Sequence, residues 1–149
     1  MRGSVLNRLP GRISLAVLLA AGFSSVALAG TVTVTATGVR NNQGVVRCGL
    51  YSSPDGFRVP GKETRQAIGQ ISQGRSQCSF GDVPPGTYAV ALFHAEHNET
   101  ALQTGLFGRP KQGVGFSNNP SISFGPPSFK DAAFTVGSKP VNLQIQMKY

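Results

Sequence analysis

The chain has 149 residues, a length that accommodates one ordinary domain and is too short for two. Only 13% of its residues are charged, and it contains 19 Gly and 10 Pro. Because Gly and Pro both interrupt helices, this composition excludes a helical bundle.

Residues 1–29 have the features of a cleaved export signal. Three arginines lie within the first 12 residues, and residues 13–23 (ISLAVLLAAGF) form an apolar run. This run is too short to cross a bilayer, which takes about 20 apolar residues. Ala27-Leu28-Ala29 supplies the small residues that signal peptidase accepts, so we expect cleavage before Gly30. The alternative is an uncleaved membrane anchor; with cleavage, the protein is periplasmic or secreted and keeps no membrane span.

Residues 30–149 carry a moderate positive charge. Of the 14 Lys and Arg residues, three lie in the leader, which leaves 11 against six Asp and Glu and a net charge of +5. Such a charge favours anionic partners. The basic residues are scattered along the chain and form no basic helix, so we do not expect specific nucleic-acid binding.

The two cysteines, Cys48 and Cys78, both lie in strand-like runs. An even pair in an oxidising compartment usually forms a disulfide, which is our prediction. The alternative is two separate buried thiols.

Short runs rich in β-branched and apolar residues alternate with Gly, Pro and Asn turns along the chain. They predict an all-β chain: one antiparallel β-sandwich domain of about seven strands over residues 30–149. The predicted strands are residues 31–37, 45–51, 65–72, 76–80, 87–94, 132–136 and 141–147. The side chains expected to face the core are those of Val32, Val34 and Ala36, of Val46, Cys48 and Leu50, and of Val141, Leu143, Ile145 and Met147.

Residues 95–130 form the long exception, a Gly/Pro/Phe-rich segment with no convincing strand. Loops of this length in small domains are uncommon and often functional. Four phenylalanines are expected to anchor it to the domain: Phe107, Phe116, Phe124 and Phe129. A fifth, Phe57, is expected to close the end of the core.

Several motifs resemble known families. Residues 80–90 (FGDVPPGTYAV) are similar to an edge of transthyretin-like (prealbumin-like) sandwiches. Residues 107–111 (FGRPK), 115–119 (GFSNN) and 124–132 (FGPPSFKDA), in that order, resemble the bacterial family called domain of unknown function 2141. The likeness extends over about residues 32–149 and implies an exported β-sandwich.

That family commonly has an acidic run after its central strand, which reads like a calcium loop. The matching positions here are Ala95, His97, Glu99 and Gln103, so one carboxylate remains. We therefore expect no calcium site and no cofactor.

Both histidines lie in this segment. His94, His97 and Glu99 have the ligand types that bind Zn²⁺ or Cu²⁺, and a turn is able to bring them together. The alternative is that His94 is hydrogen-bonded at a strand end and His97 is exposed to solvent.

Catalysis has little support in the sequence. There is no G-x-S-x-G nucleophile motif, and only six acidic residues are available for acid–base chemistry. We expect no enzyme and assign no catalytic residues.

The leading hypothesis is a non-catalytic binding or accessory module of the cell envelope. Its expected ligand surface comprises Arg109, Lys111, Phe116, Asn118 and Asn119. Amides beside an aromatic ring suit an envelope glycan, peptide or protein, and the two cations suit an anionic group on it. The alternatives are a structural protein that pairs through a sheet edge, such as its N-terminal Thr/Val strand, and a small His/Glu metal-binding protein.

Overall fold

The computed structural model describes Gly3 and residues 28–149, so the leader predicted for residues 1–29 lies almost wholly outside the described part. The all-β prediction is confirmed: eight strands and three very short helical turns make up the regular structure of the described residues. In chain order these elements are β1 (Gly30–Thr37), β2 (Val45–Tyr51), η1 (Pro54–Gly56), β3 (Arg65–Ser72), β4 (Arg75–Val83), β5 (Gly86–Ala95), η2 (Leu106–Gly108), β6 (Val114–Phe116), α1 (Phe129–Ala132), β7 (Phe134–Val136) and β8 (Val141–Gln146).

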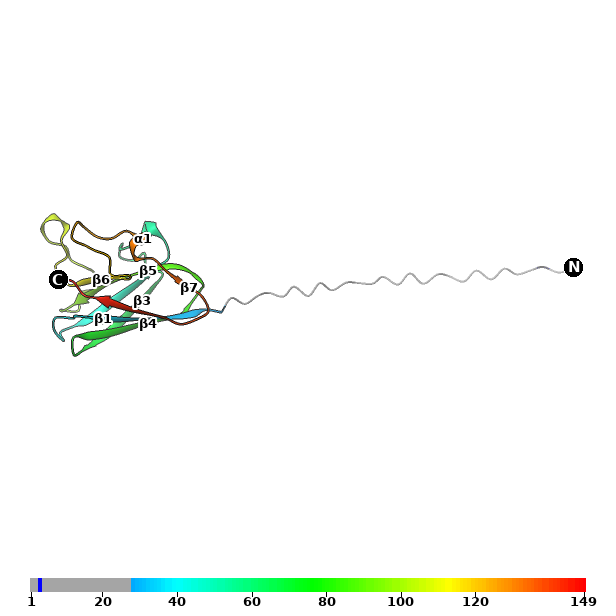
Figure 1. Cartoon of the computed structure of the whole chain (residues 1–149), viewed down its shortest axis with the longest axis horizontal. Helices are drawn as coiled ribbons and strands as arrows, with labels where there is room; N and C mark the ends of the chain where they lie inside the picture. The colour runs from blue at the N-terminus through cyan, green and yellow to red at the C-terminus, as the bar shows by residue number, and fades with distance from the viewer. Residues whose placement is uncertain (1–2, 4–27) are drawn as a thin grey trace.

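The strands form one nearly closed, barrel-like sheet (Figure 1). Their order is β6-β5-β2-β3-β4-β1-β8, and β7 pairs with β5 outside this path. Just after β8, Lys148 pairs with Val114 of β6 through two backbone hydrogen bonds of 2.8 Å. The last strand thus returns to the first in the order. For this reason the expected sandwich of two separate sheets is not shown.

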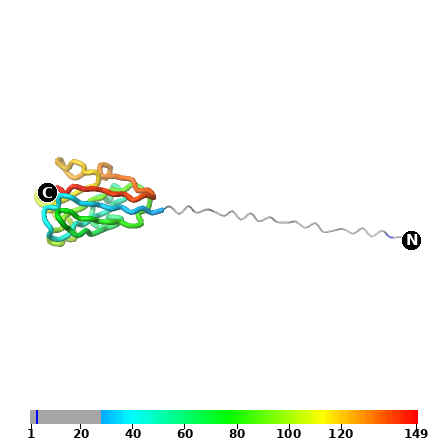
Figure 2. The backbone as a smooth tube through the Cα atoms, turned by 60° about the horizontal axis from the view of Figure 1, so that its bottom comes forward, coloured from blue at the N-terminus to red at the C-terminus, as the bar shows by residue number. Residues whose placement is uncertain are grey.

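The N-terminal strand β1 does not offer a sheet edge. It pairs antiparallel with β4 on one side and parallel with β8 on the other. In Figure 2, β1 (blue) and β8 (red) run side by side. The expectation that β1 is an exposed edge is therefore wrong, because its backbone groups already have partners in the chain itself; assembly through another edge stays an alternative proposal.

The core inside the sheet holds the inward-facing side chains predicted for the first two strands. Ile145 of β8 and Met147, which follows the end of β8 at Gln146, are buried there as well. Val141 and Leu143 are partly buried and pack against the same cluster. The predicted disulfide is confirmed: Cys48 of β2 is bonded to Cys78 of β4, with the two Cα atoms 6.5 Å apart. The two sulfurs bridge a place where the sheet is weakly paired, because β3 and β4 pair at two positions only.

The segment 95–130 contains a strand that the sequence did not reveal. Residues 114–116 (β6) pair with residues 91–93 of β5, and α1 begins at Phe129. Three residues are too few to show the alternation by which strands are recognised. Helix α1 also takes Ala132, which had been assigned to a strand, because Ser128 and Asp131 cap each other and start a helical turn there.

Candidate functional site

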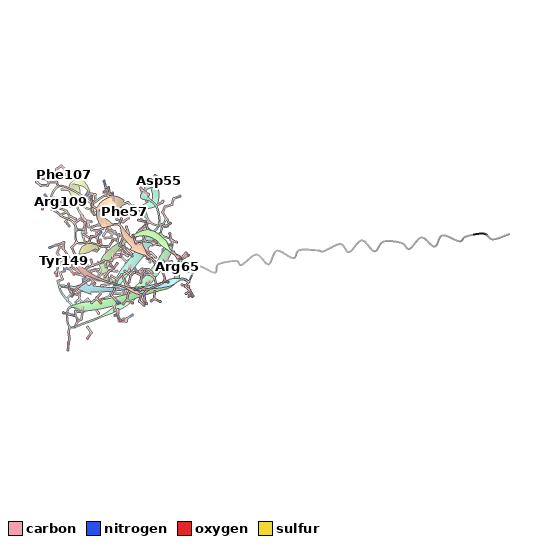
Figure 3. The ribbon with its side chains drawn as sticks, turned by 45° about the vertical axis from the view of Figure 1, so that its right-hand side comes forward. Asp55, Phe57, Arg65, Phe107, Arg109 and Tyr149 are labelled. Carbon is pink, nitrogen blue, oxygen red and sulfur yellow. A yellow bond between two sulfur atoms is a disulfide. The ribbon has the colours of Figure 1, made fainter. Side chains whose placement is uncertain are left out.

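A second apolar layer lies outside the barrel, on the face of β2, β5 and β6. Phe57, which follows η1, packs there edge-on against three rings: Tyr51, Phe116 and Phe129, with ring centroids 5.4, 6.3 and 5.8 Å away. Phe57 therefore does not close the end of the barrel core as expected. Instead, it fastens the segments around η1 and α1 to the outer face of the sheet, on the upper side in Figure 3.

Beside this layer lies a groove with a volume of about 1090 Å³. Its floor is the outer face of the sheet, and its walls are three segments: residues 58–63, the loop of residues 100–110 and the loop of residues 122–126. Sites for small molecules usually have about 300–1,000 Å³, so this groove is large enough for an extended ligand.

Strand register builds the floor in two rows, because alternate residues of a strand face the same side. One row runs across the sheet through Ile68, Arg47, Phe93 and Val114. The next row runs through Gln66, Gly49, Ala91 and Phe116. The middle of the second row consists of the small residues Gly49 and Ala91, and the Tyr51 ring packs over Gly49, where a Cβ atom would lie 2.9 Å from it.

The loop of residues 100–110 includes a hairpin that stands at one wall. Thr104 and Pro110 form an isolated β-bridge, and the amide of Lys111 donates to the carbonyl of Gln103 at 2.9 Å. At its tip, Phe107 is 99% exposed and has a φ of 58°, in the left-handed region that non-glycine residues seldom adopt. The backbone thus holds an apolar ring out in solvent, where Figure 3 labels it beside Arg109.

The wall formed by residues 122–126 carries a second exposed ring. The amide of Gly125 donates to the carbonyl of Ile122 at 3.2 Å, and this turn carries a fully exposed Phe124. Of the four phenylalanines expected to anchor the segment, Phe116 and Phe129 do so, whereas Phe107 and Phe124 point away from the protein interior and line the groove.

Three polar side chains that line the groove carry buried atoms without a hydrogen-bond partner: Arg47 Nε, Gln112 Nε2 and Glu63 Oε2. The other polar atoms of two of them are occupied. Gln112, only 6% exposed, accepts from the amide of Gln103 at 2.8 Å through Oε1, and Glu63 Oε1 accepts from Gln66 at 2.7 Å. A buried donor or acceptor without a partner costs free energy, so these two donors and one acceptor mark positions where a ligand gains hydrogen bonds.

The five residues predicted to bind a ligand do not form one surface. Arg109 lines the groove as an exposed side chain, and Phe116 lies at its floor. Lys111 lines a separate, smaller cavity of about 170 Å³.

The two asparagines of that predicted surface hold the fold together instead. Asn118 Nδ2 donates to the carbonyl of Ala133 at 2.8 Å, and Asn119 Nδ2 donates to that of Gln144 at 3.0 Å. Asn119 Oδ1 in turn accepts from the amide of Gln146 at 2.8 Å. Their amides tie the turn after β6 to α1 and β8, and therefore have little capacity left for a ligand.

His94 lies inside the barrel with no exposed surface and has partners on both ring nitrogens. Nε2 is 2.7 Å from the carbonyl of Gln43, which only accepts, so Nε2 carries the proton. In the neutral ring Nδ1 then accepts from the Tyr149 hydroxyl at 2.8 Å, and that hydroxyl accepts from the amide of Arg40 at 3.1 Å. Both ring nitrogens of His94 and the Tyr149 hydroxyl are thus hydrogen-bonded, and these bonds hold Tyr149 against the barrel.

The three residues predicted as metal ligands are not brought together. His97 is exposed, and its Nδ1 lies 3.3 Å from Glu99 Oε1, whereas His94 is engaged inside the barrel. Among residues 28–149, no group of three His, Cys, Asp or Glu side chains is placed to hold a metal ion. His97 and Glu99 instead line the small cavity with Arg40 and Glu96.

Ion pairing and hydrogen bonding set the charges at this cavity. Arg40 hydrogen-bonds to Glu96, which lowers the pKa of that carboxyl and raises the pKa of the guanidinium. Hydrogen bonds from its own amide and from His97 lower the pKa of Glu99. Both carboxylates are therefore ionised at neutral pH.

Sequence reasoning missed Arg47 and Gln112. A signal for Arg47 was present, because it is the one charged residue in the predicted strand 45–51 and lies on the face opposite to Val46, Cys48 and Leu50. No pattern marked Gln112, whose burial depends on how the hairpin of residues 103–111 folds back.

The fold and the groove define the class: an all-β protein with a nearly closed sheet and a ligand-sized groove on its outer face. The chain matches, over residues 34–144, the family described as "uncharacterized protein conserved in bacteria (DUF2141)", and it belongs to this family. The comparisons with curated proteins and with solved structures returned no match. Within the part of the chain that the structure describes, no helix has the length and apolar character needed to cross a membrane.

Proposed function

We propose that this protein is an exported binding protein of the bacterial envelope, periplasmic or secreted, and that its ligand lies in the outer groove. The groove itself carries the proposal. It has a largely apolar floor that includes Arg47 and Gln66, two walls that carry exposed phenylalanine rings, and buried donors without partners. An apolar hollow with a few convergent polar groups is the usual form of a ligand site.

Binding without catalysis is the function that this lining supports best. Among the described residues that line the groove, Glu63 is the only acidic side chain, and there is no histidine. General acid–base catalysis usually relies on such groups. The export signal predicted from the sequence and the disulfide between Cys48 and Cys78 support a location outside the cytoplasm.

The test is to fill the groove and measure binding of an uncharged apolar probe, N-phenyl-1-naphthylamine. Ala91 lies in the middle of the floor, so A91F places a ring in the hollow. The matched control is S79F, because Ser79 is exposed on β4 and does not line the groove.

We expect the parent protein and S79F to bind the probe and to enhance its fluorescence with the same saturation curve. A91F is expected to lose at least about tenfold in affinity, provided that its circular dichroism spectrum is unchanged. Equal binding by A91F and S79F would refute the groove as the site, and no binding by the parent protein would refute the proposed function.

A further inference from the structure

We propose that the groove binds a single-chain amphiphile with a carboxylate head, which lies at the Arg47 end while its acyl chain extends along the floor toward Ala91. This inference rests on the proposed function and names its ligand class.

The charges of the groove are distributed unevenly along β2. Arg47 lies in the same row as Val114, and Val114 pairs with Lys148, so two cations flank this end of the floor. Arg109, in the hairpin of residues 103–111 that Gln112 follows, adds a third cation to the lining of the groove. At the far end Arg58 is accompanied by Glu63, so that end has no excess of positive charge. An anionic group is therefore attracted to the Arg47 end.

The donors without partners lie at this same end. Arg47 Nε and Gln112 Nε2 are buried and make no hydrogen bond in the protein. Gln112 lies two residues before Val114, which is in the same row as Arg47, and therefore lies at the same end of the groove. A carboxylate accepts several hydrogen bonds, and those from charged donors are the strongest. The carboxylate thus supplies the acceptor that Arg47 Nε and Gln112 Nε2 lack, whereas Glu63 Oε2, an acceptor without a donor, lies at the other end of the groove.

The remainder of the floor suits an acyl chain better than a peptide. Strands β2 and β5 have neighbours on both sides, so the backbone beneath the groove is already hydrogen-bonded. A peptide laid on this floor would bury amide groups that find few partners, which is costly. An acyl chain has no such groups and gains from contact with Phe93, Ala91 and Phe124.

The experiment compares three twelve-carbon ligands as competitors of bound N-phenyl-1-naphthylamine: laurate, dodecanol and dodecyltrimethylammonium, all below their micelle concentrations at pH 8. We expect laurate to compete at a concentration at least about tenfold lower than dodecanol does, because a charge-assisted hydrogen bond adds this much affinity. The cationic ligand is expected to be the weakest.

The variant R47M removes the guanidinium and keeps most of the apolar side chain. We expect it to bind the uncharged probe normally and to reduce the laurate preference to about threefold or less, whereas R75M, on exposed Arg75 of β4, keeps the full preference. If R47M does not fold, R109M at the exposed hairpin is expected to reduce the preference about twofold to fivefold.

Equal competition by laurate and dodecanol, with the probe bound in the groove, would overturn this inference and leave the proposed function intact. An unchanged laurate preference in both R47M and R109M would overturn the placement of the head group. Displacement by an apolar peptide with a free carboxyl end, without displacement by laurate, would replace the amphiphile with a peptide ligand. If neither the probe nor any amphiphile binds, the proposed function fails as well.

Discussion

Removal of the disulfide should reveal how much of the stability depends on the cross-link between β2 and β4. Cys48 and Cys78 are separated by 30 positions, and closing a loop of this size stabilises the folded state by about 3.7 kcal/mol in the chain-entropy treatment. For a domain of this size each kcal/mol corresponds to about 4 °C in Tm. The double variant C48A/C78A is therefore expected to melt about 15 °C below the oxidised protein.

The location of the bond makes the prediction more specific. The two cysteines connect β2 with β4 across a part of the sheet where β3 and β4 pair only at residues 71–72 and 75–76. Without the bond, amide hydrogens of β3 and β4 should exchange faster than those of β5, which lies deeper within the paired region.

Urea unfolding, hydrogen exchange and a thermal melt test this reasoning together. The unfolded state of the variant is free to expand, so its m value should be larger than that of the oxidised protein. A melting temperature within about 4 °C of the oxidised protein, with an unchanged m value, would refute the argument.

Two further predictions concern tyrosines. Y149F removes the hydroxyl that satisfies His94, so we expect a loss of about 1–3 kcal/mol in urea unfolding. Y88F removes a donor to the backbone carbonyl of Pro84, an exposed residue, and leaves no fully buried ring nitrogen without a partner, so it should cost less; an equal loss would contradict the role given to Tyr149. Burial and, to a lesser degree, Glu63 raise the pKa of Tyr51 from 10.0 to about 12. The folded protein favours the neutral phenol of Tyr51. The stabilisation that results from its raised pKa is therefore present in full below pH 10 and is lost as the pH rises toward 12. An alkaline titration followed at the phenolate absorbance should lack this late phase in Y51F, and a late phase that persists in Y51F would contradict the assignment.

Much of the fold was predictable because short-range chemistry decides it. Runs of β-branched and apolar residues between Gly, Pro and Asn turns located seven strands, and alternation within β1 and β2 located the side chains that face the core. The disulfide between Cys48 and Cys78, predicted from two cysteines in strand-like runs, is confirmed. The strand β6 was not predictable, because a three-residue strand exists only through its pairing with β5.

The candidate site was predicted less well. The segment 95–130 was correctly singled out, yet its motif residues divide between groove and scaffold: Arg109 lines the groove, while Asn118 and Asn119 hydrogen-bond to the backbone of other segments. A side-chain amide that binds a ligand and one that binds a distant carbonyl look the same in a sequence. Their roles depend on which segments fold against them.

The sequence by itself determined that this chain is all-β, that its cysteines are available to each other, and that it belongs with the family whose loop motifs it carries. These properties follow from neighbouring residues and from periodicity along the chain. Only the tertiary structure decided that β8 returns to close the sheet and that Phe107 and Phe124 stand out in solvent. It also placed Arg47 in the floor of a groove, because this position is created by the register of four strands and by loops that pack on them from elsewhere in the chain.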